Sequence, residues 1–344
     1  MQKRQMVKGR EKGKGGHGLG SAKGEVDEEE AKSEVALALY ASESDGLPRS
    51  RKDILSFAKL AEKSNCDDDL LIAANHLVDL SKKRELDNEE RNLVSIAYKL
   101  YVGKRRTAWQ ALVPIRAQWG EYKYGHSNSP SADPESDIRA SWTDDYIHKI
   151  EQELEDICAE INLIIEEKLL PTSGSMEGKV FFRKMAADYC RYLAEFRAGE
   201  HRKEAGELAL RNYKLASALA ENHLRATNPV RLGLALNFSV FYYEILGFHD
   251  RARHLANVAY DEALATLDGL PEEHYQDSTV ILQLLRDNLQ IWAQEARDAQ
   301  QMSQQMSQQQ QQQQQQQGDG EEEEDRDREM NVGVGLDYRQ GLRK

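Results

Sequence analysis

The sequence predicts an all-α protein, and three observations carry that prediction. Between about residues 51 and 297, apolar residues recur at intervals of three and four, the spacing of one helix face. The breaks between these segments contain helix-ending turn residues, and no segment alternates with period two for long enough to require a sheet. About nine helices joined by short loops indicate an antiparallel helical array.

The order of the helices follows from their starts and breaks. Asp87 is an expected N-cap, with the carboxylate of Glu90 three residues later, and Leu93, Ala97 and Leu100 then repeat at helical spacing. Breaks are expected at Leu170–Gly174, Asn228-Pro229, Gly247 and Gly269–Pro271. Later helices are predicted over Tyr146–Leu170, Val180–Phe196, Ala205–Leu219, Val230–Leu246, Ala252–Leu267 and Thr279–Trp292.

The two ends of the chain have the composition of disordered extensions. Residues 1–50 change from Lys and Gly to an acidic stretch, and residues 298–344 contain the glutamine run Gln308–Gln317 and an acidic tail. Such segments bury too little apolar surface to offset the entropy lost on ordering. The sequence therefore predicts one helical domain over 51–297 between two disordered segments.

The charge and the cysteines indicate which cellular compartment and which classes of binding partner to expect. The formal net charge is −13, although residues 1–24 hold seven Lys or Arg residues against one acid. An acidic body argues against nucleic-acid and anionic-membrane binding. The three cysteines are far apart, no zinc spacing is visible, and no uncharged stretch is long enough to span a bilayer. A reducing intracellular compartment is expected, with neither metal nor cofactor.

Cations at matched spacing form the first candidate site. Lys99 and Arg106 are seven residues apart, two helical turns, so they project from one face, which Gly103 leaves open. Lys184 and Arg191 repeat this spacing, and Tyr192 follows. If the two helices pack side by side, the cations converge and can hold a dianion such as a phosphate. Taken singly, each is more often a solvated charge on an amphipathic face.

Two asparagines on apolar stripes form the second candidate site. Asn237 lies among Gly233, Leu236, Val240 and Glu244, and Asn288 lies among Ile281, Leu284, Leu285 and Trp292. An amide can donate and accept together, which suits it to holding the backbone of an extended peptide. The competing interpretation is a buried or capping core asparagine at each position.

Other functional classes have weaker support. The histidines lack the His-Glu-x-x-His spacing of a zinc protease, and no nucleophile or cofactor loop emerges, so no catalytic residue is predicted. A helical scaffold of the tetratricopeptide type, binding unphosphorylated peptides, would need a 34-residue repeat, and none is found. A third hypothesis, an RNA-associated protein that uses its basic N-terminus, is based on composition alone, and the acidic body opposes it.

Four parts of the sequence stand out together: Asn88–Leu93 with Ala97-Tyr98-Lys99 and Gly103–Arg106, then Asp188–Glu195, Arg231–Leu246 and Asp277–Trp292. These four parts resemble the 14-3-3 family. The resemblance covers roughly residues 55–297. It implies nine antiparallel helices forming one half of a cup-shaped dimer, and a non-enzymatic adaptor that binds phosphoserine or phosphothreonine segments of client proteins in the cytosol and nucleus.

The resemblance also implies roles for individual residues. Phosphate would be bound by Lys99, Arg106, Arg191 and Tyr192, with Lys184 lining the same pocket. The ligand backbone would be held by Asn237 and Asn288, beside Glu244 and an apolar wall of Leu236, Val240, Leu284, Ile291 and Trp292. A homodimer, or a heterodimer with related chains, would form through Leu60, Leu112, Ile115, Tyr146, Lys149 and Glu153.

One region departs from the family pattern. Pro114 falls inside the expected third helix, where proline should kink or end it. Beyond it, Gly120–Asp137 is expected to be a long connection, with Pro130 and Pro134 in a Ser- and Asn-rich stretch. The dimer interface is therefore expected to differ from that of relatives.

Overall fold

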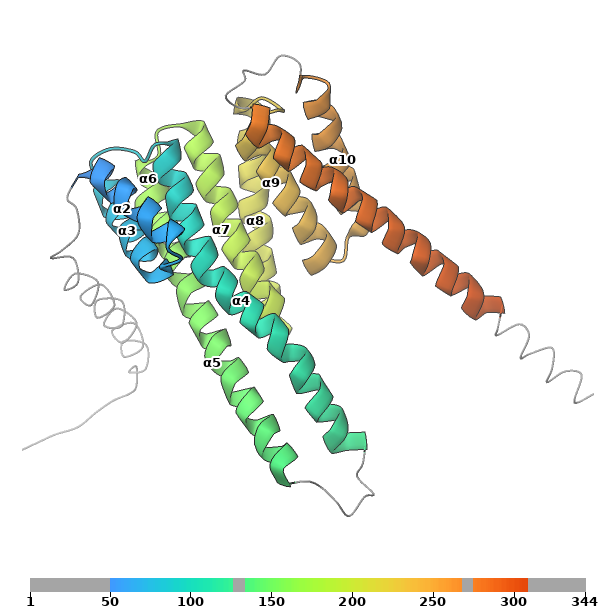
Figure 1. Cartoon of the computed structure of the whole chain (residues 1–344). Coiled ribbons are helices and arrows are strands. Elements are labelled where there is room, and N and C mark those ends of the chain that lie inside the picture. The colour runs from blue at the N-terminus through green and yellow to red at the C-terminus, as the bar shows by residue number, and fades with distance from the viewer. Residues whose placement is uncertain (1–49, 126–133, 268–274, 309–344) are drawn as a thin grey trace, which may run out of the picture. The chain divides into compact units, whose positions relative to one another are not determined.

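The computed structural model of the chain describes residues 50–125, 134–267 and 275–308, apart from the side chains of 119–125 and 134–137. Within these ranges no β-strand occurs (Figure 1), which confirms the all-α prediction. The chain divides after Leu77 into two compact units. The predicted disorder of residues 1–49 and 309–344 and the break at Gly269–Pro271 lie outside the described residues.

The described residues form nine helices when each π-helical segment is counted with the helix that it continues. These are α2 (Arg51–Lys63), α3 (Asp67–Leu80), α4 (Asn88–Gly125), α5 (Pro134–Ile164) with η2 (Ile165–Leu169) and α6 (Leu170–Thr172), α7 (Met176–Phe196), α8 (Gly199–His223), α9 (Pro229–Val240) with η3 (Phe241–Ile245), α10 (His249–Leu264) and a last helix over 275–308. None of the described helices is both long and apolar enough to cross a membrane.

The first unit contains α2 and most of α3. The Ser50 side chain accepts a hydrogen bond from the Asp53 backbone N–H and caps α2. At the other end Asn65 has φ of 56°, a left-handed conformation that asparagine tolerates better than most residues. This residue therefore ends α2 and allows α3 to begin at Asp67.

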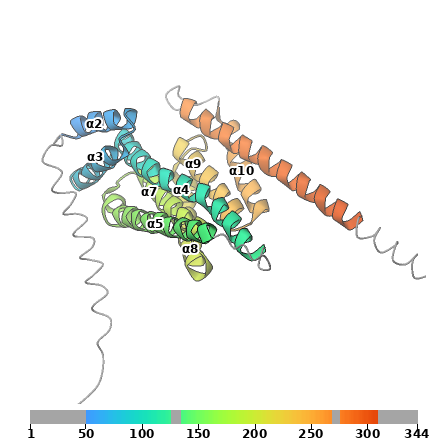
Figure 2. The same cartoon turned by 60° about the horizontal axis from the view of Figure 1, so that its bottom comes forward.

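In the second unit, each helix packs on the next. Contacts join α4 to α5, α5 to α7, α7 to α8, α8 to α9 and α9 to α10 (Figure 1 and Figure 2). The predicted cap of α4 is confirmed as a reciprocal pair. Glu90 N–H donates to Asp87 Oδ1 at 3.0 Å, and Asp87 N–H donates to Glu90 Oε2 at 3.0 Å.

Two expectations around Pro114 are wrong: that the helix could end there, and that the whole of 120–137 would be a connection. Helix α4 does not end at Pro114 but continues to Gly125, and α5 begins at Pro134, so much of the connection expected over 120–137 is helical. Pro114 is exposed, so water can satisfy the Gln110 carbonyl that loses its intrahelical donor. Pro134 occupies the first helical position, where a missing N–H has no consequence.

The start of α7 is fixed by a carboxylate from the segment before α4. Glu85 accepts hydrogen bonds from the Ser175 hydroxyl at 2.6 Å, the Ser173 hydroxyl at 3.0 Å and the Gly174 N–H at 3.0 Å. Burial opposes its charge, but these donors outweigh burial and lower the pKa of Glu85. The Ser175 side chain caps α7, which therefore starts at Met176 and not at Val180 as predicted.

The breaks after α8 and α9 follow the predicted turn residues. The Asn228 side chain accepts from Val230 N–H at 2.9 Å and Arg231 N–H at 3.3 Å, with Pro229 at the first position of α9. Gly247 has φ of 67°, which ends the helical run after η3. The last helix extends past residue 297, where the domain was expected to end, and its final turns are exposed and glutamine-rich. Glutamine is a good helix former.

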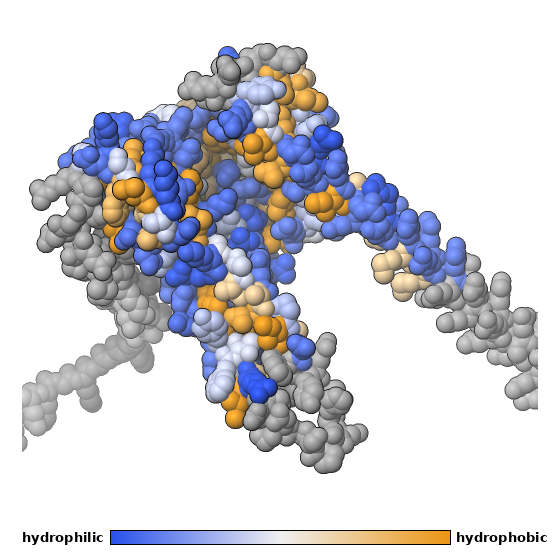
Figure 3. Space-filling model, in the orientation of Figure 1, coloured by the Kyte–Doolittle hydropathy of each residue, from blue (hydrophilic) through white to orange (hydrophobic). Residues whose placement is uncertain are grey.

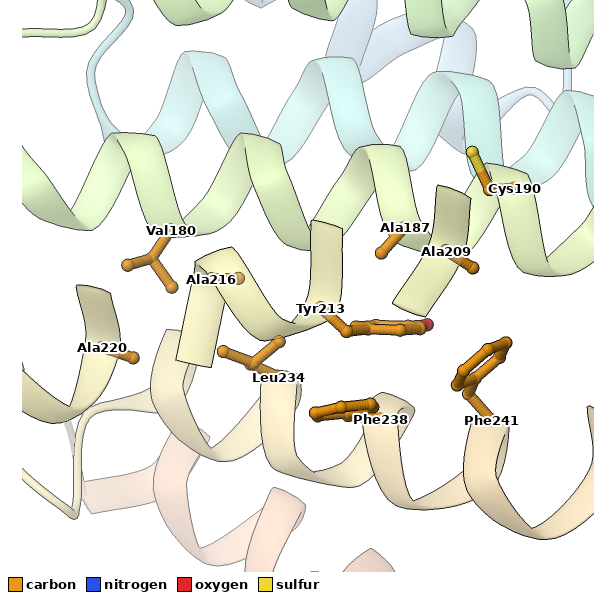
Figure 4. Close-up of a cluster of buried hydrophobic side chains, with 10 residues drawn as sticks. All are labelled: Val180, Ala187, Cys190, Ala209, Tyr213, Ala216, Ala220, Leu234, Phe238 and Phe241. Atoms are coloured by element: carbon orange, nitrogen blue, oxygen red, sulfur yellow. The ribbon is translucent and has the colours of Figure 1, made fainter. Parts of the chain in front are cut away.

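Two buried clusters hold the later helices together. In the first, Tyr213 of α8 stacks on Phe238 of α9, with ring centroids 4.9 Å apart, while Ala187, Ala209 and Ala216 let α7 and α8 approach closely (Figure 4). In the second, Leu232, Ala252, Ala256, Leu285 and Trp292 join α9, α10 and the last helix. The two clusters thus hold together α7, α9 with η3, and the last helix, which carry all of the candidate groove residues except Lys99 and Arg106 of α4.

Candidate functional site

Arg106 of α4 and Arg191 of α7 are brought together by one carboxylate. Glu195 Oε2 accepts from Arg106 Nε and Glu195 Oε1 accepts from its terminal nitrogen, both at 2.8 Å. Arg191 donates to Glu195 Oε1 at 3.3 Å. The convergence expected from the two matched spacings is therefore present for this pair.

Tyr192 lies against both guanidinium groups. Its ring centroid is 4.0 Å from the Arg106 guanidinium carbon and 4.5 Å from that of Arg191. Cation–π attraction at these distances stabilises two like charges near each other. Tyr192, which the resemblance implies as a phosphate ligand, thus also supports the two cations through its ring.

Arg191 is nearly fully buried, at 7% exposure, which is unusual for a charged side chain. Burial alone would lower the pKa of Arg191, but the neighbouring Tyr213, Asp188 and Tyr192 raise it well above its ordinary value. Its charge is therefore fixed and its position is set by buried partners.

Asp188 joins three helices beneath this pair. Its carboxylate accepts from Tyr213 of α8 at 2.5 Å, from the Asn237 amide of α9 at 2.9 Å and from Lys184 at 2.9 Å. Burial would raise the pKa of Asp188, but Lys184, Arg191 and Tyr213 outweigh that effect and lower it. Asp188 is thus an ionised centre that orders α7, α8 and α9 around the cations.

The other two predicted cations occupy different settings. Lys184 forms its ion pair with Asp188, and its Cε lies 3.6 Å from where a Cβ on Gly233 would be, an ordinary van der Waals contact. Lys99 is exposed on α4, two turns before Arg106, and none of the described residues forms an ion pair with it. A Cβ on Gly103 would meet nothing within 4 Å, so the intervening face is open, as predicted.

The two predicted asparagines differ. Both hydrogen bonds of the Asn237 amide nitrogen go to Asp188 oxygens, which leaves its carbonyl directed elsewhere. Asn288 is half-buried on the last helix and has no hydrogen bond to another described residue. Only Asn288 therefore keeps its whole amide for a ligand.

The side chains predicted to form the apolar wall differ in how far they are exposed to solvent. Leu284 and Ile291 are 46% and 54% exposed, and apolar patches lie among hydrophilic ones over the first part of the last helix (Figure 3). Leu236 and Val240 are half-buried beside the second cluster. Trp292 is 5% exposed and stacks on Tyr243 at 4.5 Å, so it supports the wall from behind.

Glu244 adds a carboxylate near the cations. Burial raises the pKa of Glu244, and the negative charge of Glu195 raises it further. The positive charges of Arg191 and Arg106 lower it, but the net shift is upward. The site thus combines positive groups for an anion with carboxylates for a cation or backbone N–H. Among the described residues, no group of His, Cys, Asp and Glu could hold a metal ion.

The sequence matches the family model described as "14-3-3 protein" over residues 57–293. The chain belongs to the 14-3-3 family. It is 46% identical over 244 residues to "14-3-3-like protein C" of Glycine max, covering 71% of this chain and 89% of that protein. It is 45% identical over 247 residues to "Checkpoint signal transducer rad24" of Schizosaccharomyces pombe, covering 72% and 86% respectively.

Membership of the 14-3-3 family confirms the resemblance identified from the sequence. It places the chain among non-enzymatic adaptor and signalling proteins. The 14-3-3-like protein GF14 chi of Arabidopsis thaliana is 45% identical over 253 residues, covering 74% of this chain and 90% of that protein. The matched region contains all of the candidate site.

The residues predicted for a 14-3-3 dimer interface include several exposed apolar side chains. Leu60, Ile115 and Tyr146 are 67%, 40% and 54% exposed, and Leu112 is half-buried. Lys149 is exposed, and its ammonium lies 4.0 Å from the Glu153 carboxylate. Glu153 also accepts a hydrogen bond from Arg105 of α4 at 2.9 Å, so it is held more firmly within its own chain than Lys149 is.

Sequence reasoning about this 14-3-3 site missed two residues. Glu195 lies four residues after Arg191, so the spacing of an intrahelical ion pair could have indicated it. Tyr213 lies on another helix, and no local pattern connects it to Arg191. Its position is set by the tertiary packing in Figure 4.

Proposed function

We propose that this chain is an adaptor that binds phosphoserine- or phosphothreonine-containing segments of client proteins. The observation that carries the proposal is the pairing of Arg106 and Arg191 through Glu195 and the Tyr192 ring. Two guanidinium groups from different helices, held in place before a ligand arrives, suit a dianion with three oxygens. Preorganisation reduces the entropy lost on binding.

The surroundings of this pair support an extended peptide as the carrier of the phosphate. The Asn288 amide has no hydrogen bond to another described residue, and Leu284 and Ile291 offer exposed apolar surface on the same helix. An amide can pair with a peptide backbone whatever its sequence, whereas the apolar side chains add contact area. The combination favours phosphorylated protein segments over a free phosphate metabolite.

The proposal includes self-association and a location. An adaptor of this kind would bridge or mask its clients, and the exposed apolar residues Ile115 and Tyr146 give this chain a surface on which a second copy can pack. A homodimer, or a heterodimer with a related chain, would present two phosphate sites to one client or to two. The location proposed for this activity is the cytosol, with the nucleus as a second site.

The decisive experiment is a calorimetric titration with one peptide in phosphorylated and unphosphorylated forms. The phosphorylated form is expected to bind at least a hundredfold more tightly. Arg191→Ala should remove most of that difference, whereas Arg251→Ala, which removes a cation stacked on Phe248, should leave it unchanged. Equal affinity for both peptide forms would favour the alternative, a helical scaffold that binds unphosphorylated segments.

A further inference from the structure

Tyr213 places a hydroxyl between the two buried charges of α7. The side chain is 0% exposed, yet its hydroxyl donates to Asp188 Oδ1 at 2.5 Å and accepts from Arg191 Nε at 3.2 Å. Burial and the negative charge of Asp188 raise the pKa of Tyr213 well above its ordinary value. The hydroxyl therefore keeps its proton and bridges the two groups.

This bridge restricts the guanidinium of Arg191. Its Nε–H is held by Tyr213, and one terminal nitrogen is held by Glu195 at 3.3 Å. The second terminal nitrogen lies 3.6 Å from Asp188, beyond a good hydrogen bond. With two corners fixed, the plane of the guanidinium is set, and hydrogens of its terminal nitrogens remain for an incoming anion.

The hydroxyl is not needed for packing. The Tyr213 ring stacks on Phe238 with planes 14° apart, an arrangement that phenylalanine would preserve. The surrounding cluster consists mainly of alanine, leucine and phenylalanine side chains, where a hydroxyl without partners would be unfavourable. Its presence is explained by the two charged groups that it joins.

We propose that Tyr213 is a positioning residue that holds the Arg191 guanidinium in the orientation that receives the ligand phosphate, without touching the ligand itself. The proposal rests on the proposed function, because it assigns Tyr213 a role in phosphate recognition. The residue acts from α8 on a side chain of α7, so it links core packing to ligand discrimination.

Tyr213→Phe is the direct test, and Tyr242→Phe is a matched control. Tyr242 also stacks on Phe238, at 4.6 Å, and its hydroxyl has no hydrogen bond to another described residue. The phosphopeptide should bind about tenfold more weakly to Tyr213→Phe, the effect of losing one hydrogen bond to a charged group. Tyr242→Phe should change that affinity less than twofold.

A double-mutant cycle separates positioning from a general structural role. In an Arg191→Lys background the Nε partner of Tyr213 is absent, so adding Tyr213→Phe should weaken phosphopeptide binding by less than about twofold. Losses that multiply across the two substitutions would overturn the proposal, as would unchanged affinity in Tyr213→Phe alone. If the wild type itself fails to prefer the phosphorylated peptide, the proposed function falls first.

A measurement on the wild type keeps the test independent of the variant's folding. The Arg191 Nε–H should give a slowly exchanging nitrogen-15 NMR signal, because a buried hydroxyl accepts from it. The signal is assigned by its loss in Arg191→Lys. Rapid exchange of this proton in the folded wild-type protein would overturn the proposal.

Discussion

Arg106 and Glu195 form a two-pronged ion pair between α4 and α7, with both N–O distances at 2.8 Å. Glu195 also accepts from Arg191, so a single carboxylate fixes the spacing of two cations. The pair explains how a site with converging positive charge remains folded without a ligand. It also makes the planar fork of arginine, and not charge alone, the property on which the site depends.

Arg106→Lys should therefore weaken phosphopeptide binding although the positive charge is retained. An ammonium group cannot make both bonds to Glu195, so we expect a loss of about 1–2 kcal/mol, roughly tenfold in affinity. Calorimetry with one phosphopeptide measures the change. Arg251→Lys, a charge-conserving substitution away from the site, is the control, and equal affinity in Arg106→Lys and the wild type would contradict the prediction.

Alanine substitutions of the two asparagines should differ in their effect on thermal stability, although both should weaken phosphopeptide binding. Asn237→Ala removes an amide that donates to the buried Asp188, so both the melting temperature and phosphopeptide affinity should fall. Asn288→Ala should lower affinity about tenfold with no change in melting temperature, since none of the described residues bonds to it. Calorimetry and thermal unfolding on both variants test this contrast. Matching thermal losses would show that Asn288 is a core residue.

The fold was predictable wherever its cause is local. The reciprocal bonds of Asp87 and Glu90 and the Asn228-Pro229 start of α9 depend on residues within three positions of each other. Patterns at that range are visible in a sequence. The family resemblance then extended the prediction to the whole helical array.

The site was predictable only in part, because the residues that hold its cations in place are brought there by tertiary packing. Equal spacing brought Arg106 and Arg191 into consideration, but the hydrogen bond from Arg191 to Tyr213 connects two helices. Pro114 does not end α4, although a proline lowers the stability of a helix interior. The residue is exposed, so water can hydrogen-bond to the backbone carbonyl that has lost its intrahelical donor.

Glu85 should contribute stability that is lost in acid. Its pKa is lowered in the folded protein, so the contribution is present above the unfolded pKa of a glutamate and disappears as pH falls through the lowered value. Glu85→Gln should lower the free energy of unfolding by about 1–2 kcal/mol at pH 7. Melting curves from pH 7 to pH 3 should show the two proteins converging in acid. The control Glu207→Gln, on an exposed part of α8, should match the wild type throughout.

Pro114→Ala should stabilise α4. The substitution restores the hydrogen bond from position 114 to the Gln110 carbonyl and removes the ring clash, and both residues are exposed. We expect the free energy of unfolding to rise by about 1–3 kcal/mol in urea titrations. Gln110→Ala, which alters only the neighbouring side chain, should be neutral. Destabilisation by Pro114→Ala would indicate that the proline makes a contact required by the assembled protein.

Self-association should depend on an apolar stripe of α5. Ile138, Trp142 and Tyr146 are 48%, 67% and 54% exposed, and spacing of four places them on one helix face. Exposed aromatic residues of this kind are frequent anchors of protein interfaces, so Trp142→Ala should cost about 2 kcal/mol of dimer stability. Because α4 continues beyond Pro114 and α5 begins at Pro134, the stripe has a longer helical support than the sequence suggested.

Sedimentation over a dilution series measures the dissociation of the dimer and so tests this prediction. The wild type should remain a dimer at micromolar concentration, and Trp142→Ala should dissociate at roughly thirtyfold higher concentration, the equivalent of about 2 kcal/mol. Leu208 is 42% exposed on a different helix, α8, so Leu208→Ala should leave the dimer unchanged. A wild-type protein that is monomeric at tens of micromolar would refute self-association through this stripe. The phosphate site would be unaffected, because Arg106, Arg191 and Glu195 all come from one chain.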